Sequence, residues 1–154
     1  MEAPVSASPA LEVRNLTYAM FVDQGRAPTA AEVARAARLS EREVEAAWHE
    51  LHREHALVLN PATTEIRMAA PFSAVRTAFH VEAAGRWWYG NCAWDAVGIC
   101  AALHADGRIE TSCPDCGDSI ALAVRGHTLD DGNEGVLFHC LVPAAHWWDD
   151  IVFT

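Results

Sequence analysis

The sequence contains no lysine, so its positive side-chain charge comes from 11 arginines, set against 21 aspartates and glutamates. The formal net charge is −10. A surface of that sign repels nucleic-acid phosphates unless the arginines cluster. The composition therefore argues against nucleic acid as a partner.

The sequence also has no apolar run approaching the ~20 residues that cross a bilayer. Residues 1–9 have neither a basic start nor an apolar core, so we interpret them as a loose tail and not as a signal peptide. Half of the 154 residues are hydrophobic, which predicts a globular chain of one domain or two small ones. We predict a cytoplasmic protein with no membrane partner. In that compartment its five cysteines are thiols, metal ligands or catalytic groups before they are disulfides.

Residues 1–70 are predicted to form a winged-helix-like module. Helices are expected over residues 11–22, 30–37 and from 41 onward, and the last two follow capping boxes in which Thr or Ser precedes Glu by three residues. Strands over 56–59 and 65–68 would form the hairpin of the wing. The first helix is indicated by the apolar residues Leu11, Leu16, Ala19, Met20 and Phe21. The third helix is expected to bury Val44, Ala47, Trp48 and Leu51.

This module carries seven arginines and ten acidic residues, and the third helix is itself acidic. Phosphate contacts dominate affinity for DNA, so we favour a structural scaffold over a DNA reader. Three histidines near the end of that helix are interpreted as a solvated face: His49, His52 and His55.

Residues 71–154 are predicted to form an antiparallel sheet with one main helix over 92–104, which makes the fold class α+β, with the helical module packed on this core. Strands are expected at 79–81, 108–112, 119–124 and 136–142, and another is expected to begin at 151–154. A tight turn is expected at 113–117 and a short helix or turn at 144–150. The bulky segment 85–90 is interpreted as an aromatic approach to the helix.

The most informative motif is Asn91-Cys92-Ala-Trp-Asp95. With Asn91 as the N-cap, Cys92 would lie in the first helical turn and share a face with Asp95. The helix dipole would then favour the Cys92 thiolate, which attacks electrophiles or binds soft metals. A carboxyl group beside it can hold or deliver a proton. Either residue alone is more often structural, but the pair favours chemistry at a thiol-bound atom.

The remaining cysteines have weaker signals. Cys100 lies among apolar residues and is predicted to be a core thiol. Cys113 and Cys116 resemble half of a zinc knuckle, but a closed zinc site needs four ligands, so we favour the absence of zinc. The missing ligands would have to come from His139, Cys140 or His146. Cys140 lies on a predicted central strand, either in the core or facing the motif helix.

Four motifs resemble the alkylmercury lyase family, the bacterial organomercurial lyases: Phe79-His-Val, Gly85-Arg-x-x-Tyr89, Asn91-Cys92-Ala-x-Asp95 and Ser112-Cys113. The resemblance covers most of residues 72–154, and the N-terminal module also fits. It implies protonolysis of a carbon–mercury bond, in which two cysteine thiolates hold mercury and an aspartate handles the proton. By position, Cys92 matches the first mercury-binding cysteine, Asp95 the proton-handling aspartate, and Cys113 a structural cysteine.

The resemblance implies an organomercurial substrate, no resident cofactor, and low-molecular-weight thiols or mercuric reductase as acceptors of Hg(II). It also implies a second mercury-binding cysteine beyond 146–154, where the sequence ends. Either the sequence is truncated before that cysteine, or the protein is a divergent member in which Cys140 or Cys116 substitutes. Two alternatives remain: a non-catalytic thiol or metal-binding sensor on the same scaffold, and a winged-helix regulator, against which the acidic third helix argues.

Overall fold

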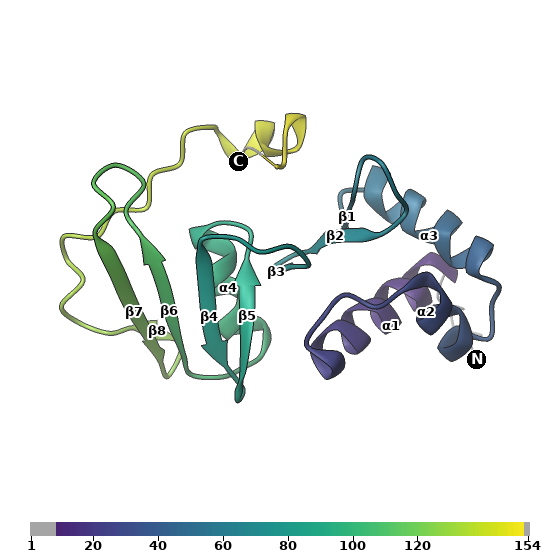
Figure 1. Cartoon of the computed structure of the whole chain (residues 1–154), viewed down its shortest axis with the longest axis horizontal. Helices are drawn as coiled ribbons and strands as arrows, with labels where there is room; N and C mark the ends of the chain where they lie inside the picture. The colour runs from purple at the N-terminus through teal and green to yellow at the C-terminus, as the bar shows by residue number, and fades with distance from the viewer. Residues whose placement is uncertain (1–8, 153–154) are drawn as a thin grey trace, which may run out of the picture. The chain divides into compact units, whose positions relative to one another are not determined.

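The computed structural model describes residues 9–152 of the chain (Figure 1). The chain divides after Ala70 into two compact units. The first unit contains α1 (Pro9–Gln24), α2 (Ala30–Ala37), α3 (Glu41–Arg53), β1 (Val58–Leu59) and β2 (Ile66–Ala69). The predicted tail lies outside the described residues except for Pro9, which begins α1. Across residues 9–152, no helix combines the length and the apolar character that crossing a membrane requires.

The helices α2 and α3 begin where the capping boxes predict. The Thr29 and Ser40 side chains accept the backbone N–H of Glu32 and Glu43, and each glutamate accepts the N–H of its N-cap in return. The helix α2 ends at Arg38, which adopts the left-handed conformation. The buried face of α3 is the predicted one: Val44, Ala47, Trp48 and Leu51.

The helix α1 is longer than predicted, and its buried face differs from the apolar residues that indicated it. The buried residues are Ala10, Val13, Thr17 and Phe21, and only Phe21 is among the apolar residues that indicated this helix. Leu11, another of those residues, is 42% exposed. A buried threonine is tolerated here because its hydroxyl donates to the Val13 carbonyl at 2.7 Å and accepts the Trp48 indole N–H at 2.9 Å. Thr17, although polar, therefore belongs to the buried face of α1.

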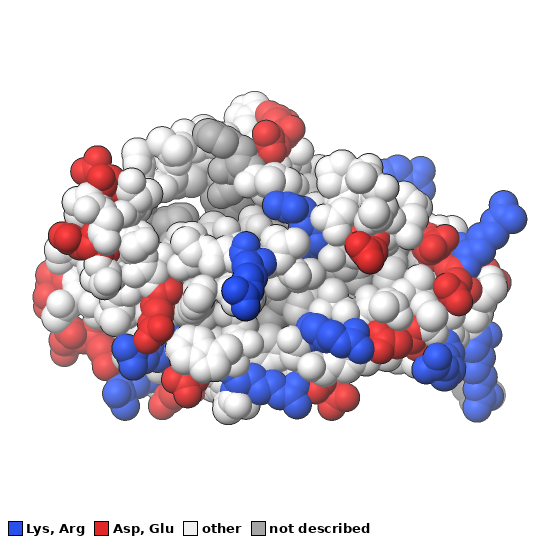
Figure 2. Space-filling model, in the orientation of Figure 1, with Lys and Arg blue, Asp and Glu red and all other residues white. Residues whose placement is uncertain are grey.

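The outer surface of α3 is charged, as expected. Figure 2 shows arginines and acidic side chains interspersed over much of the visible face, with several acidic side chains along its left edge. His49 and His55 are exposed. His52 is half-buried, with Nδ1 3.3 Å from the Leu57 carbonyl oxygen, so the prediction of a solvated face fails for this histidine.

The second unit is an antiparallel sheet with one helix, which confirms the α+β class. Its elements are β3 (Phe72–Ser73), β4 (Phe79–Ala83), β5 (Arg86–Gly90), α4 (Ala93–Ala102), β6 (Gly107–Ser112), β7 (Ser119–Arg125), β8 (Thr128–Leu129) and a 3-10 helix, η1 (Ala144–Asp149). The strand order is β3-β5-β4-β6-β7-β8, with every neighbouring pair antiparallel. The helix α4 packs on β4, β5 and β6.

Alternation along the strands builds the core under α4. Val81 of β4 lies opposite Trp88 of β5 and Ile109 of β6, and all three are buried. The buried residues of α4, which packs on these strands, are Ala96, Ile99 and Cys100. The prediction that Cys100 is a core thiol is confirmed. The segment 85–90, interpreted from sequence as an aromatic approach, is therefore largely strand β5.

The predicted strand at 136–142 is wrong. This segment is irregular, and Val136, Leu137, Phe138 and Leu141 are exposed. A strand needs a neighbour for its backbone hydrogen bonds, and no strand among residues 9–152 pairs with 136–142. Residues 151 and 152 form a turn and not the start of a strand, while 153 and 154 lie outside the described residues. The short helix at 144–150 is confirmed as η1.

Candidate active site

Cys92 lies directly before α4 and is its N-cap, which corrects the prediction that Asn91 caps the helix and Cys92 opens it. The backbone of Cys92 is extended, and its carbonyl accepts the first helical hydrogen bond, from the Ala96 N–H at 3.0 Å. The helix also ends earlier than predicted, at Ala102, with His104 in the left-handed conformation. The sulfur therefore occupies the position where Ser or Thr usually caps a helix.

The Cys92 thiol and the Asp95 side chain meet at the start of α4, although the Cys92 side chain makes no capping hydrogen bond. The sulfur donates to Asp95 Oδ2 at 3.7 Å, and Asp95 occupies the N3 position. The backbone N–H groups of Asn91 and Cys92 reach the carboxylate and oppose the rise of its pKa. The sequence predicted the pairing, but the structure achieves it by N-cap geometry and not by two residues on one helical face.

Burial raises the pKa of Cys92, and the charge of Asp95 and its hydrogen bond raise it further. The amides of Asp95 and Trp94 act in the opposite direction but do not prevail. The expectation that the helix dipole favours the Cys92 thiolate is therefore wrong for the resting protein, because desolvation outweighs the dipole. Burial also raises the pKa of Asp95. The Cys92 thiol and the Asp95 side chain therefore share a hydrogen bond along which a proton can move between them.

The position of Cys92 depends on close contact between the end of β5 and the start of α4. Gly90 ends β5, and its carbonyl accepts the Thr77 hydroxyl at 2.5 Å. A Cβ at Gly90 would lie 2.8 Å from the Ala96 nitrogen and 3.2 Å from the Cys92 carbonyl oxygen. Asn91, between them, donates its side-chain N–H to the Ile151 carbonyl at 3.4 Å.

Gly90→Ala is expected to lower the free energy of unfolding by about 1–3 kcal/mol, as overpacking does, and to displace Cys92. The clash is with backbone atoms, which cannot move aside as a flexible side chain can. Urea unfolding and the alkylation rate of Cys92 measure the two effects. Gly135→Ala is the matched control, because its added Cβ meets nothing within 4 Å. Equal stability of the two variants would show that the first turn of α4 is loosely held.

Two aromatic residues near this helix start were not predicted as part of the site. Trp94, between Cys92 and Asp95 in sequence, is 65% exposed. Its ring centroid lies 6.4 Å from that of Phe138, and the planes are inclined by 34°. Trp94 could have been noticed from the sequence because it lies inside the Cys-x-x-Asp motif. Its contact with Phe138 could not, because Phe138 is distant in the sequence.

Cys140 does not form a metal-ligating group with Cys92 and Asp95 among the described residues. Cys140 is exposed, and its thiol donates to the Val142 carbonyl at 3.0 Å. Within residues 9–152, no group of three or more His, Cys, Asp or Glu side chains could hold a metal ion. Cys113 and Cys116 lie together in the turn between β6 and β7. The backbone amides of Cys116 and Asp115, with the Cys116 thiol, lower the pKa of Cys113. The Asp118 amide opposes a rise in the pKa of Cys116, but the Cys113 thiol and the Asp118 side chain raise it.

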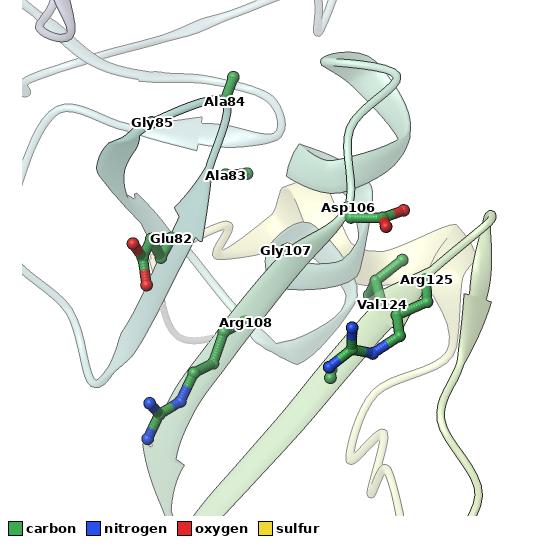
Figure 3. Close-up of a pocket in the computed structure, with 10 residues that line it drawn as sticks. Glu82, Ala83, Ala84, Gly85, Asp106, Gly107, Arg108, Val124 and Arg125 are labelled. Carbon is green, nitrogen blue, oxygen red and sulfur yellow. The ribbon is translucent and has the colours of Figure 1, made fainter.

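A hollow of about 340 Å³ lies at the other end of strands β4 and β5, away from Cys92. Figure 3 shows Glu82, Arg108 and Arg125 on the neighbouring strands β4, β6 and β7 that line it. The two arginines are already paired, with Glu110 at 2.8 Å and Asp130 at 3.0 Å respectively. The hollow contains no thiol, so it is separate from the chemistry of Cys92.

Asp95→Asn is expected to lower the pKa of Cys92, because it removes a negative charge and an acceptor that favour the protonated thiol. The alkylation rate of Cys92 should then rise at neutral pH, and its pH profile should shift to lower pH. Peptide mass spectrometry separates this labelling from that of buried Cys100, which should remain slow. In the control Asp106→Asn, the Cys92 profile should not move. An unchanged profile in Asp95→Asn would mean that the carboxylate does not act on the thiol.

The family match to known proteins lies in the second unit of the chain. The family model for MerB, alkylmercury lyase, matches residues 72–154. Among solved structures, the crystal structure of the mercury-bound form of MerB2 matches with a TM-score of 0.63 and 21% sequence identity. The match covers 77% of this chain and 58% of that chain, so this chain spans less than two thirds of that protein. At this identity the structural match shows the fold alone. Comparison with curated proteins finds no match.

Proposed function

The chain belongs to the alkylmercury lyase family, and we propose that it cleaves carbon–mercury bonds by protonolysis at Cys92 and Asp95, releasing a hydrocarbon and Hg(II). The observation that carries this proposal is the contact between the Cys92 sulfur and Asp95 Oδ2 at 3.7 Å. A soft nucleophile in contact with a proton carrier supports this reaction. The substrate is an organomercurial, which is a soft electrophile suited to a thiolate.

In the proposed first step, mercury binds the Cys92 sulfur. The thiol proton passes to the Asp95 carboxylate along the existing hydrogen bond, and the anion previously bound to mercury leaves. The raised pKa of Asp95 supports this transfer, because a buried carboxyl group accepts a proton more readily than an exposed one. Formation of the sulfur–mercury bond thus leaves Asp95 protonated, and the next step uses this proton.

In the proposed second step, protonated Asp95 delivers its proton to the carbon bound to mercury. The carbon–mercury bond breaks, its electron pair forms the new carbon–hydrogen bond, and Asp95 returns to the carboxylate. Mercury remains as Hg(II) on sulfur. Asp95 acts as a general acid within reach of a metal held on Cys92.

A single thiolate activates the carbon–mercury bond only weakly, so the proposal needs a second sulfur on mercury. Within residues 9–152, no second thiol forms a metal-ligating group with Cys92 and Asp95, and Cys140 lies in an exposed irregular segment. We propose that low-molecular-weight thiols can supply this sulfur in the assay. They, or mercuric reductase, would then accept Hg(II).

Release of benzene from phenylmercury tests the proposed function. The purified chain is incubated with phenylmercury and excess small-molecule thiol, and benzene is measured by gas chromatography. We expect release well above that of the thiol alone, in proportion to protein concentration. Release equal to the thiol background would reject the lyase proposal.

A second candidate function is binding of organomercurials without cleavage. It is favoured by the absence, within residues 9–152, of a third metal-ligating side chain beside Cys92 and Asp95. A binding protein would retain phenylmercury on Cys92 as a stable adduct, which intact-mass measurement would detect, and would release no benzene.

A further inference from the structure

The turn between β6 and β7 holds two cysteines that the proposed reaction does not use. Ser112 and Ser119 are the last paired residues of the hairpin, and the Cys113 N–H donates to the Asp118 carbonyl at 2.8 Å just beyond them. The Gly117 N–H donates back to the Cys113 carbonyl at 2.9 Å. The chain between the two cysteines is therefore fixed at both ends before any ligand arrives.

The turn carries both thiols on one short loop. Cys113 and Cys116 are free, and the hydrogen bond from the Gly117 N–H to the Cys113 carbonyl closes the loop around them. The Cys116 thiol also contributes to lowering the pKa of Cys113. Gly117 adopts the left-handed conformation, with φ of 78°, which lets the chain turn back into β7. Cys116 is exposed and Cys113 is partly so, so both thiols of the loop are accessible to solvent.

The number of donors determines which ions suit this turn. Structural zinc requires four ligands, and within residues 9–152 no third His, Cys, Asp or Glu side chain completes a set with these two. A soft ion that is satisfied by two thiolates in a near-linear arrangement has no such need. Hg(II) is such an ion, and thiolates are its preferred ligands.

We propose that Cys113 and Cys116 form a two-thiolate binding site for Hg(II), separate from Cys92. The further statement that this ion is the product of carbon–mercury cleavage rests on the proposed function. The site would hold Hg(II) on the chain once it leaves Cys92, and would keep the reacting thiol available for the next substrate.

Transfer to this site is a ligand exchange in which no atom is oxidised or reduced. Hg(II) arrives bound to two thiolates, from Cys92 or from small-molecule thiols. Cys113 and Cys116 each lose a proton and form a sulfur–mercury bond, while the two departing thiolates each gain a proton. The second bond forms within the turn, at an effective concentration of about millimolar or more, so the pair should outcompete monothiols below that concentration.

The test uses the full chain carrying Cys92→Ser and Cys140→Ser, which removes the other accessible thiols and leaves buried Cys100. One equivalent of inorganic Hg(II) is added with a few-fold excess of glutathione at micromolar concentration. After desalting, bound mercury is measured by intact-mass spectrometry. We expect one Hg(II) per chain, lost at least ~10-fold when Cys116→Ser or Cys113→Ser is added, because only monodentate binding remains.

Retention of Hg(II) that is independent of Cys113 and Cys116, or no retention at all, would overturn the proposal. Stoichiometric Zn(II) held against a chelator would also overturn it, because it would reveal further ligands. Circular dichroism checks that the exposed turn substitutions leave the fold intact. Inorganic Hg(II) binds without any cleavage, so failure of the lyase proposal would leave this result unchanged, and the two failures are distinguishable.

Discussion

Cys92→Ser should reduce benzene release from phenylmercury to the background of the small-molecule thiol alone. Serine keeps the N-cap position of α4, where it is a better capping residue than cysteine, so the helix should form normally. Its hydroxyl oxygen is a hard donor that remains protonated near neutral pH and does not bind mercury as a thiolate does. A loss of benzene release would therefore report on the missing sulfur and not on a disturbed fold. The rate of benzene release with thiol in excess is the measurement.

Cys100→Ala is the matched control for this substitution. It removes the other thiol of α4, which is buried and is not needed for any proposed step. Activity per folded chain should be retained, although some stability is lost where the sulfur packs against Gly107. Substantial benzene release by Cys92→Ser would show that another thiol holds the substrate, and Cys92 would become a structural N-cap.

Asp95→Asn should slow benzene release by ~10²–10⁴-fold, the usual contribution of a general acid, while Cys92 still binds phenylmercury. The amide keeps the size of the carboxyl group but has no proton of suitable acidity to give to carbon. Adduct formation, followed by intact mass, should persist, because the lower pKa of Cys92 supplies thiolate directly and solvent takes the proton that Asp95 accepts in the unchanged chain. Binding and proton delivery are thereby separated in one variant.

Asp106→Asn is the control for loss of an acidic residue near the other end of α4. Asp106 accepts the Gly126 N–H at 2.9 Å, and the asparagine oxygen can do the same. Its activity should not change. If Asp95→Asn lost adduct formation together with turnover, the carboxylate would be a structural part of the helix start and not the proton donor.

The sequence was informative wherever a local rule was sufficient. The capping boxes at Thr29 and Ser40 placed α2 and α3, because the N-cap and N3 side chains satisfy helix-end amides without help from the rest of the fold. The alternating hairpin around the turn at 113–117 was likewise recognisable. The prediction of a strand at 136–142 failed because a strand depends on pairing with a segment distant in sequence, which no local pattern reveals.

For the candidate site, the sequence identified the partners but not their electrostatics. The spacing of Cys92 and Asp95 predicted a contact, and the structure brings them to 3.7 Å. The pKa of Cys92 had been expected to fall at a helix start, yet it rises, because burial depends on packing around β5 and α4 that spacing cannot report. The aromatic neighbour Phe138 comes from a distant segment and was likewise beyond sequence reasoning.

The most direct test of the central claim is a single turnover in deuterium oxide. The chain is loaded with one equivalent of phenylmercury, small-molecule thiol is added, and both the benzene and the protein mass are measured. Protonolysis through Cys92 and Asp95 predicts one monodeuterated benzene per loaded chain, as the phenylmercury adduct disappears, because the exchangeable proton of the pair ends on carbon. A phenylmercury adduct that persists on Cys92, or that leaves intact on the added thiol without benzene, would contradict the account.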